Sequence, residues 1–247
     1  MRAKAWWEGY LKGAAKFRGV PMGVIRECLH TWWRTGGIGS LPVARQKAIV
    51  LALIRERYTE DKLAGILAFA EILLPHLGIG DLPAMSALYE LGHIADWNVC
   101  DWFSVKVLGR MVEQTVNRKD MARSIAVWRD APGLWQRRAA CVAFVNLAKR
   151  GDKVLPGLSA LVLRTCSVNV RSKERFLQTG VGWVLRELSL AERDAVVAFA
   201  RTHAPQMSRE CMRYVTEKMP EDLRRELIAA QGSSPPGNKR KHRTHRK

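Results

Sequence analysis

The stretch from Ser40 to Leu77, SLPVARQKAIVLALIRERYTEDKLAGILAFAEILLPHL, decides the fold class of this chain. Apolar residues recur in it every three or four positions, which is the period of a helix that buries one face. Ser40 and Pro42 precede the first apolar run, and a capping residue followed by an early proline is typical of a helix start. Thr59 and the two acidic residues after it mark a second start, because anions in the first turn favour the helix dipole. The stretch predicts two helices joined by a tight turn, Val43–Tyr58 and Glu60–Leu74.

The same helical period continues along the chain, and no alternating apolar run indicates a strand. Further helix starts are marked by Pro83, Pro132, Ser208 and Pro220, and by a capping-box pattern of Ser189 with Glu192. Helix pairs recur about every 35 to 40 residues, which is typical of an α-solenoid. The predicted pairs are Val43–Leu77, Leu82–Asn117, Lys119–Arg150, Asp152–Leu188 and Leu190–Met219. We therefore expect an all-α chain, with one helical-repeat domain over residues 1–230.

Residues 231–247 differ in composition from the rest of the chain. They combine a Ser-Ser-Pro-Pro-Gly run with a basic segment, so we expect a disordered basic tail. The chain of 247 residues has 41 Lys and Arg against 23 Asp and Glu, a net charge of +18. Six of the positive charges lie in the last ten residues, which leaves the body at +12. A basic body with a basic tail favours a polyanionic partner such as nucleic acid, the alternative being a basic protein without one.

The cysteines and the hydropathy indicate the compartment. Five cysteines lie far apart with no Cys-x-x-Cys pair, which argues against a zinc ribbon or a disulfide framework. No secretory signal is present, and no apolar run is long enough for a membrane span. The longest candidate, Leu63–Leu77, is interrupted by Glu71, Pro75 and His76. We expect a soluble cytoplasmic protein with no membrane contact.

Several enzyme classes are excluded by missing motifs. The sequence has no phosphate loop, nucleophile elbow, His-Glu-x-x-His zinc motif or dinucleotide glycine fingerprint. The glycines of Gly36–Gly39 follow no predicted strand, so they indicate a helix break. His242 and His245 have a metal-ligand spacing, but they lie in the basic tail, and we expect neither a metal nor a cofactor. Any catalysis would have to depend on carboxylates and aromatic side chains.

The segment Asp96–Trp102, DWNVCDW, is the first candidate for such chemistry. If it is helical, Trp97 and Asp101 lie four residues apart and therefore on the same face. An indole beside a carboxylate suits a cationic sugar or base. A tryptophan in the core with an aspartate at the surface explains the segment equally well.

Two further segments contain unusual residues. Leu134–Ala140 places Arg137 and Arg138 on a helix whose other positions are small or apolar. Gln178–Glu187 has two glycines directly before a tryptophan, and each interior glycine costs a helix roughly 1 kcal/mol against alanine. Tight packing between helices is the favoured explanation of these glycines.

Together, the segments Phe17–Val20, Trp97–Asp101, Trp135–Ala140 and Gly182–Glu187 resemble the bacterial DNA alkylation repair family. These are the DNA glycosylases of the AlkD type, which are built from HEAT-like helical repeats. The resemblance runs from about Tyr10 to Met219 in the same order. Its most specific part is Gly182–Glu187 followed by Met207–Glu210.

This resemblance implies an α-solenoid of HEAT-like repeats with a concave basic face. It also implies a monofunctional glycosylase that removes cationic N3- or N7-alkylated purines, bulky adducts included, from duplex DNA without flipping the base into a pocket. By matching position, Asp101 and Trp97 are the catalytic pair, Trp183 is a second active-site tryptophan, and Arg138 contacts a phosphate. Further candidates for DNA-backbone contacts are Arg137, Lys106, Arg110, Lys149, Arg171, Lys173 and Arg175, each of which is equally well explained as part of a solvated basic face. The expected protein is a monomer associated with the bacterial nucleoid.

The sequence departs from the family pattern at two places. The additional first helix is short or missing, and Gln178-Thr179-Gly180 stands where relatives often have Gln-Lys-Ala. The second departure removes a positive charge near the expected DNA face, so it bears on lesion preference. The tryptophan pairs Trp6-Trp7 and Trp32-Trp33 are expected to lie in the core.

Two other functions fit the same sequence, a non-enzymatic HEAT-like nucleic-acid binder and a protein-interaction scaffold. An Asp101 buried in an ion pair would favour the binder. Convergence of Trp97, Asp101, Arg138 and Trp183 on one concave surface would favour the enzyme.

Overall fold

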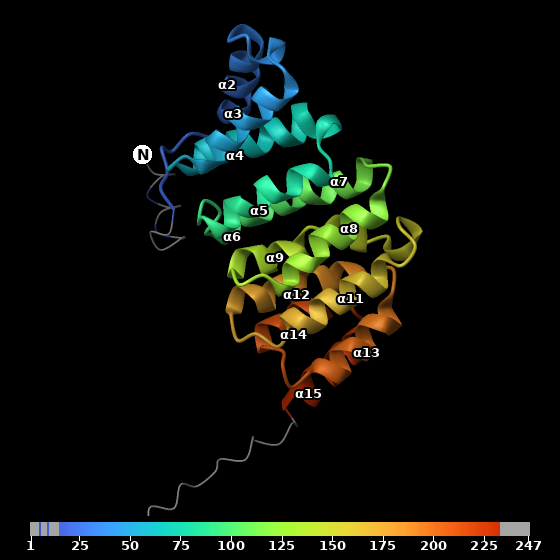
Figure 1. Ribbon diagram of the computed structural model, residues 1–247. Helices are drawn as coiled ribbons and strands as arrows, with labels where there is room; N and C mark the ends of the chain where they lie inside the picture. Colours follow the sequence, from blue (N-terminus) through green and yellow to red (C-terminus); the bar gives the residue numbers. More distant parts are fainter. Residues whose placement is uncertain (1–4, 6–8, 10–14, 233–247) are drawn as a thin grey trace, which may run out of the picture.

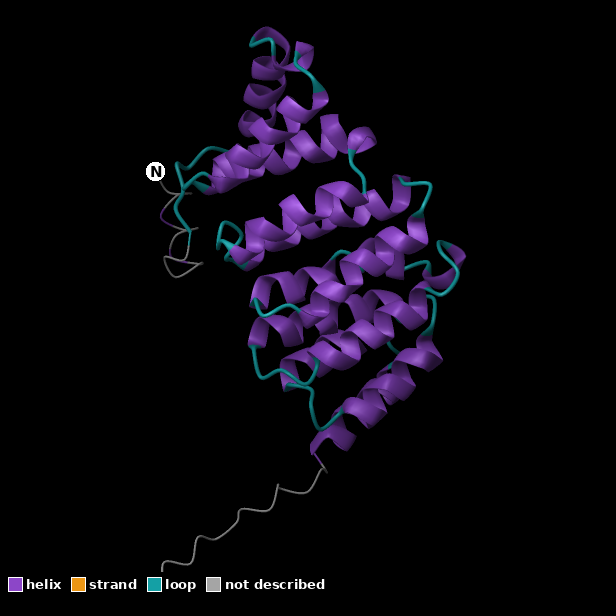
Figure 2. Cartoon of the chain, viewed as in Figure 1, coloured by secondary structure: helices purple, strands orange, loops and turns teal. Residues whose placement is uncertain are grey.

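The chain folds into a stack of α-helices (Figures 1 and 2) in a computed structural model that describes Ala5, Gly9 and residues 15–232. No strand occurs in that part of the chain, and an isolated backbone bridge joins Lys16 to Tyr58. The α-helices are α2 (Met22–Thr35), α3 (Val43–Arg55), α4 (Thr59–Ala68), α5 (Leu82–Glu90), α6 (Trp97–Phe103), α7 (Gly109–Gln114), α8 (Arg118–Ala126), α9 (Leu134–Val142), α10 (Val145–Ala148), α11 (Leu158–Asn169), α12 (Arg175–Leu188), α13 (Arg193–His203), α14 (Arg209–Thr216) and α15 (Glu221–Gly232). Short 3-10 turns cover Ile38–Ser40, Leu74–His76, Ile79–Asp81, Val127–Asp130 and Gly151–Lys153, and π-helical turns cover Phe69–Leu73 and Ser104–Leu108.

The helices form two layers that run the length of the stack (Figure 1). One layer consists of α4, α6, α9, α12 and α14, each in contact with the next. The other contains α3, α5, α8, α11 and α13, with contacts between α3 and α5, between α8 and α11, and between α11 and α13. Helices of this second layer begin at intervals of 35 to 40 residues, at Val43, Leu82, Arg118, Leu158 and Arg193. The predicted all-α helical repeat is therefore confirmed.

A continuous apolar core lies between the layers, from Ile25 near the start of the stack to Leu227 in α15. Its largest fully buried side chains include Phe69, Phe103 and Phe144. Burying one such aromatic side chain stabilises the fold by roughly 1.5–3 kcal/mol. Because each helix pair covers its neighbours, no long-range sheet is needed to close this core.

Some predicted helix ends are confirmed and others are wrong. The Ser208 hydroxyl accepts a hydrogen bond from the Cys211 amide at 3.0 Å, so this serine caps α14 as predicted. Ser189 does not begin a helix: it ends α12, and its hydroxyl donates to the Arg186 carbonyl at 2.8 Å. The next helix begins only at Arg193, so the predicted capping box is absent from this turn. The predicted start at Pro132 is followed by α9, which begins at Leu134, and by the separate short helix α10.

The predicted tryptophan pairs have different outcomes. Trp33 lies in the core with 8% exposure, as expected, whereas its neighbour Trp32 is 39% exposed. Trp6, Trp7 and the tail residues 233–247 lie outside the described residues. Gln231, assigned from sequence to the tail, belongs to α15 and donates a hydrogen bond to the Met207 carbonyl at 2.7 Å. Of the helices that the structure describes, none is both long and apolar enough to cross a membrane.

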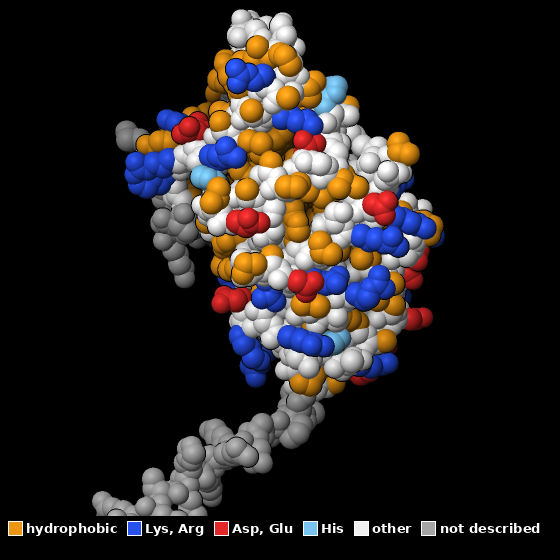
Figure 3. All heavy atoms as spheres, viewed as in Figure 1, with side chains coloured by type: hydrophobic (Ala, Val, Ile, Leu, Met, Phe, Trp, Pro, Cys, Tyr) orange, Lys and Arg blue, Asp and Glu red, His pale blue; other side chains and the backbone are white. Residues whose placement is uncertain are grey.

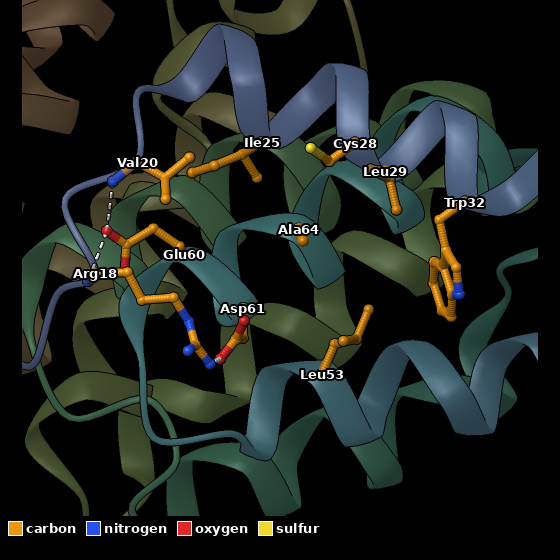
Figure 4. Close-up of a pocket in the computed structure, with 10 residues that line it drawn as sticks. All are labelled: Arg18, Val20, Ile25, Cys28, Leu29, Trp32, Leu53, Glu60, Asp61 and Ala64. Atoms are coloured by element: carbon orange, nitrogen blue, oxygen red, sulfur yellow. Dashed lines mark hydrogen bonds and ion pairs between the residues drawn. The ribbon is translucent and has the colours of Figure 1, made fainter.

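The segment Phe17–Val20 is anchored to α4 by one buried carboxylate (Figure 4). Glu60, 5% exposed, accepts hydrogen bonds from the backbone amides of Arg18, Gly19 and Val20 at 2.7 to 3.2 Å. Gly19 has a φ of +92°, a conformation that glycine adopts at little cost. The Phe17–Val20 motif is therefore explained by architecture, since it fastens the start of the chain to the first helices. An apolar cavity of about 310 Å³ between α2, α3 and α4 adjoins this anchor.

Candidate active site

Helix α6 carries the first two candidate residues on the face that does not pack against the core. Asp96 begins the helix, because its carboxylate accepts the Val99 amide at 2.9 Å. Val99, Cys100 and Phe103 face the core and are fully buried. The remaining face presents Trp97 and Asp101, one turn apart, as their spacing predicts.

The four residues singled out from the sequence line one cavity of about 330 Å³. Trp97 and Asp101 come from α6, Arg138 from α9 and Trp183 from α12. These helices are consecutive members of one layer, so the repeat itself brings together residues that lie far apart in the sequence. The rest of the lining comes from α12 and α14, namely Arg175, Phe176, Thr179, Arg186, Glu210 and Tyr214.

Within this cavity, close polar contacts join Asp101 to Arg138. The Arg138 Nε lies 2.7 Å from Asp101 Oδ1, and Nη2 lies 2.8 Å from Oδ2, which is a bidentate ion pair. The side chains are 6% and 13% exposed. The third guanidinium nitrogen, Nη1, donates to the Phe176 carbonyl and to the Thr179 hydroxyl, so one arginine connects α6, α9 and α12. Asp101 is therefore held in a fixed orientation at the cavity wall.

Burial and the ion pair act in opposite directions on Asp101. Burial raises the pKa of its carboxyl above the ordinary value, and the hydrogen bonds and charge of Arg138 offset only part of that rise. For Arg138, burial lowers the pKa, but the hydrogen bond and charge of Asp101 outweigh burial and leave the pKa raised. The arginine therefore remains a cation, whereas the aspartate takes up a proton more readily than an exposed one does.

Both glycines of the Gln178–Glu187 segment lie at close contacts, as predicted. A β-carbon on Gly180 would lie 3.3 Å from both Cγ and Nη1 of Arg138. A β-carbon on Gly182 would lie 2.8 Å from Tyr214 Cβ and 3.0 Å from the Cys211 carbonyl oxygen. Gly180 therefore leaves room for the arginine that holds Asp101, and Gly182 lets α12 and α14 approach each other.

Ion pairs surround the side of the cavity formed by α12 and α14. Arg175 contacts Glu210 through two hydrogen bonds of 2.6 and 2.7 Å, and its hydrogen bonds are the main reason that the pKa of Glu210 is lowered. Arg186 pairs with Glu187 and Glu217, and its guanidinium lies 5.9 Å from the Tyr214 ring centroid. The cavity thus combines three aromatic side chains from α12 and α14 with charges of both signs.

The residues predicted to contact DNA phosphates lie in different surroundings. Of these candidates, Arg138 and Arg175 line the cavity. The Arg137 Nε lies 3.3 Å from Asn169 Oδ1, and Arg110 donates to the Ala70 carbonyl at 2.8 Å, so both have a structural contact. The ammonium of Lys106 lies 5.8 Å from the Trp102 ring centroid. Lys149, Arg171 and Lys173 are exposed, outside the residues that line the cavity.

The structure bears on both of these alternatives, the enzyme and the binder. The four residues converge, which favours an enzyme, and Asp101 is buried in an ion pair, which favours a binder. Within the described residues, no three His, Cys, Asp or Glu side chains are grouped so that they could hold a metal ion.

Sequence reasoning missed most of the α12 and α14 lining. Arg175, Thr179 and Trp183 recur at intervals of four and therefore share a helix face, and the same spacing relates Glu210 to Tyr214. That periodicity would have identified the face. The placement of α14 beside α12 is a long-range contact that the pattern does not contain.

Comparison with known proteins agrees with this architecture. A solved structure described as a predicted DNA alkylation repair enzyme from Enterococcus faecalis superimposes with a TM-score of 0.74. The alignment covers 89% of this chain and 96% of that one at 17% identity, a level that shows a shared fold. No functionally curated protein matches the chain. The family model for DNA alkylation repair enzymes matches residues 2–219, which is most of the chain. This protein therefore belongs to the DNA alkylation repair enzyme family.

Proposed function

We propose that this protein is a monofunctional DNA glycosylase that hydrolyses the N-glycosidic bond of cationic N3- or N7-alkylated purines in duplex DNA. The observation that carries the proposal is the cavity in which Asp101, fixed by Arg138, faces the same space as Trp97 and Trp183. Membership of a DNA alkylation repair family supports the DNA substrate.

The chemistry follows from the charge of the substrate. An alkylated purine is already cationic, so it leaves as a neutral base and transfers positive character to the deoxyribose. An oriented carboxylate stabilises that charge and positions or deprotonates the attacking water. The faces of Trp97 and Trp183 attract the same cation. No lysine lines the cavity, and the reaction we propose needs no imine and no strand cleavage.

The contacts of Arg138 assign it a positioning role in this proposal. Three of its nitrogens are engaged by Asp101, the Phe176 carbonyl and the Thr179 hydroxyl. A phosphate contact by Arg138 would have to use the one N–H of Nη2 that is not bonded to Asp101. Arg175 is 66% exposed at the rim and is better placed for a backbone phosphate, because Glu210 can be exchanged for a stronger anion.

The proposal includes the remaining expectations. The protein acts as a monomer on nucleoid DNA in the bacterial cytoplasm, and it holds the duplex against one layer of the stack without drawing the base into a closed pocket. A cavity lined by four consecutive helices of that layer supports this mode, because the nucleoside can stay in the duplex while its sugar contacts the cavity wall.

The decisive experiment measures release of free base from methylated duplex DNA under single turnover. Asp101→Asn keeps the size of the side chain and removes its charge, so we expect a loss of roughly 10²–10⁴-fold in rate, the range of acid–base catalysis. DNA affinity should change little. Release at the wild-type rate by a folded Asp101→Asn variant would exclude Asp101 as the central carboxylate.

The second candidate is a non-enzymatic DNA binder, and the buried Asp101–Arg138 pair is the observation that favours it. In that case the pair would only hold α6, α9 and α12 together. Neither wild type nor variant would release base, while both would bind with a steep dependence on salt concentration.

A further inference from the structure

A second cavity, of about 320 Å³, adjoins the start of α6 and is lined by basic side chains. It lies where the end of α3, the start of α4 and the Gly92–Asp96 turn meet. Its titratable residues are Lys16, Arg55, Arg57, Lys62 and His93, with Glu56 and Asp96. Asp96 is the residue directly before Trp97, so this basic cavity and the candidate active site share one helix end.

The floor of the basic cavity is fixed by Lys62. Its ammonium donates to the Ile54 carbonyl at 3.0 Å and to the His93 carbonyl at 2.7 Å, which ties α3 to the turn before α6. Burial lowers the pKa of Lys62, and the charge of Asp96 opposes that change. Burial and the charges of Lys62 and Arg55 also lower the pKa of His93. The histidine is therefore neutral near pH 7, in a field that is already positive.

The other cations have no carboxylate partner. Lys16, Arg55 and Arg57 are exposed, and within residues 15–232 no ion pair involves any of them. Arg175 and Arg186, on the other side of the active site, are each neutralised by a glutamate. Of the acids at the basic cavity, Asp96 is occupied in capping α6. The cavity thus keeps a positive excess, and Figure 3 shows Lys and Arg atoms gathered at the edge of the molecule beside the start of α4.

We propose that this basic cavity binds a backbone phosphate of the DNA strand that carries the lesion, with Arg55 and Arg57 as the principal contacts. Exposed guanidinium groups suit this role, because they donate paired hydrogen bonds to phosphate oxygens. A phosphate held at the start of α6 fixes the strand on the Trp97 side of the active site. Arg175 lies on the α12 side, so the nucleoside between the two contacts faces Asp101. This inference rests on the proposed function for the strand it names, although binding itself can be tested without catalysis.

The test uses the full-length Arg55→Gln/Arg57→Gln variant. The matched control, Lys153→Gln/Arg193→Gln, also removes two exposed positive charges, but from positions that line neither cavity. We expect the first variant to bind duplex DNA about tenfold or more weakly than the control, since a charge-assisted hydrogen bond is lost. Its salt dependence should also fall, by about 0.9 in slope for each phosphate contact removed. Thermal unfolding of both variants should match wild type.

A phosphate scan locates the contact. Single uncharged methylphosphonate linkages are placed along the lesion strand, within one turn of an alkylated base. One position should weaken wild-type binding and leave the Arg55→Gln/Arg57→Gln variant unaffected. Equal affinity of the two double variants, or equal penalties at every linkage, would overturn the proposal. Base release by wild type is measured in parallel: if it is absent while the scan succeeds, the glycosylase proposal fails alone, and if it is present while the scan fails, this inference fails alone.

Discussion

Arg138 contacts both carboxylate oxygens of Asp101, at 2.7 and 2.8 Å, across 37 residues of sequence. The pair has two effects at once. It aims the carboxylate into the cavity, and it joins three helices of one layer. The stability and the activity of variants must therefore be measured together.

Removing one partner should destabilise the fold more than removing both. Arg138→Met leaves Asp101 buried without its cation, and breaking such a buried pair costs roughly 3–5 kcal/mol. Arg138→Met/Asp101→Asn leaves no uncompensated charge, so its free energy of unfolding should lie closer to wild type. Chemical denaturation of the two single variants and the double variant measures the coupling.

A further variant, Arg138→Lys, tests the positioning role. If Arg138 serves only to hold the helices, Arg138→Lys at a temperature where it is fully folded should release base at nearly the wild-type rate. If it aims Asp101, the rate should fall because lysine cannot form the bidentate contact, while DNA affinity stays the same.

The raised pKa of Asp101 predicts an acidic limit to activity. In the proposed reaction the carboxylate is the working form, so the rate of base release should fall as the pH drops through a value above the ordinary aspartate pKa of about 3.9. In that same interval the folded chain binds the proton more tightly than the unfolded chain, so protonation of Asp101 does not itself destabilise the fold. Single-turnover rates and thermal unfolding across pH 4 to 7 should therefore diverge. A rate that falls only together with unfolding would contradict this prediction.

The repeat was predictable because its signals are local. Helical periodicity and helix starts such as Pro83 and Ser208 lie within a few residues of the structure they specify. Ser189 shows the limit of such signals. Its hydroxyl can accept from a following amide or donate to a preceding carbonyl, and here it bonds back to Arg186. Which of these two hydrogen bonds forms depends on the turn between α12 and α13.

The site was predictable only in part, because its contacts are long-range. The spacing of Trp97 and Asp101 gives their common face, but nothing near Asp101 in the sequence identifies Arg138 as its partner. Adjacent residues on a helix point in different directions, so Arg137 lies against Asn169 while Arg138 contacts Asp101. The sequence contains both arginines without distinguishing these roles.

Alanine at the two glycines of α12 should have unequal effects. Gly182→Ala places a methyl group 2.8 Å from Tyr214 Cβ, beside backbone that cannot yield, so we expect a loss of roughly 1–3 kcal/mol from overpacking. Gly180→Ala meets Arg138 at 3.3 Å, and the gain in helix propensity of about 1 kcal/mol offsets much of the strain. Gly180→Ala should instead lower the rate of base release, since it displaces the arginine that orients Asp101. Similar unfolding free energies for both variants would contradict the packing geometry.

Removal of the basic tail should weaken DNA binding and spare the chemical step. The cut belongs after Gly232, because Gln231 is part of α15 and is hydrogen-bonded to Met207. Residues 233–247 contain six Lys and Arg, so their loss should reduce affinity and the salt dependence of binding. The described residues that line the cavity around Asp101 all precede this tail, so the single-turnover rate at saturating protein should be unchanged. A truncation that also removes Gln231 is the informative comparison, since it should lower the unfolding temperature as well. A collapse of the single-turnover rate in the shorter truncation would show that the tail takes part in placing the nucleoside.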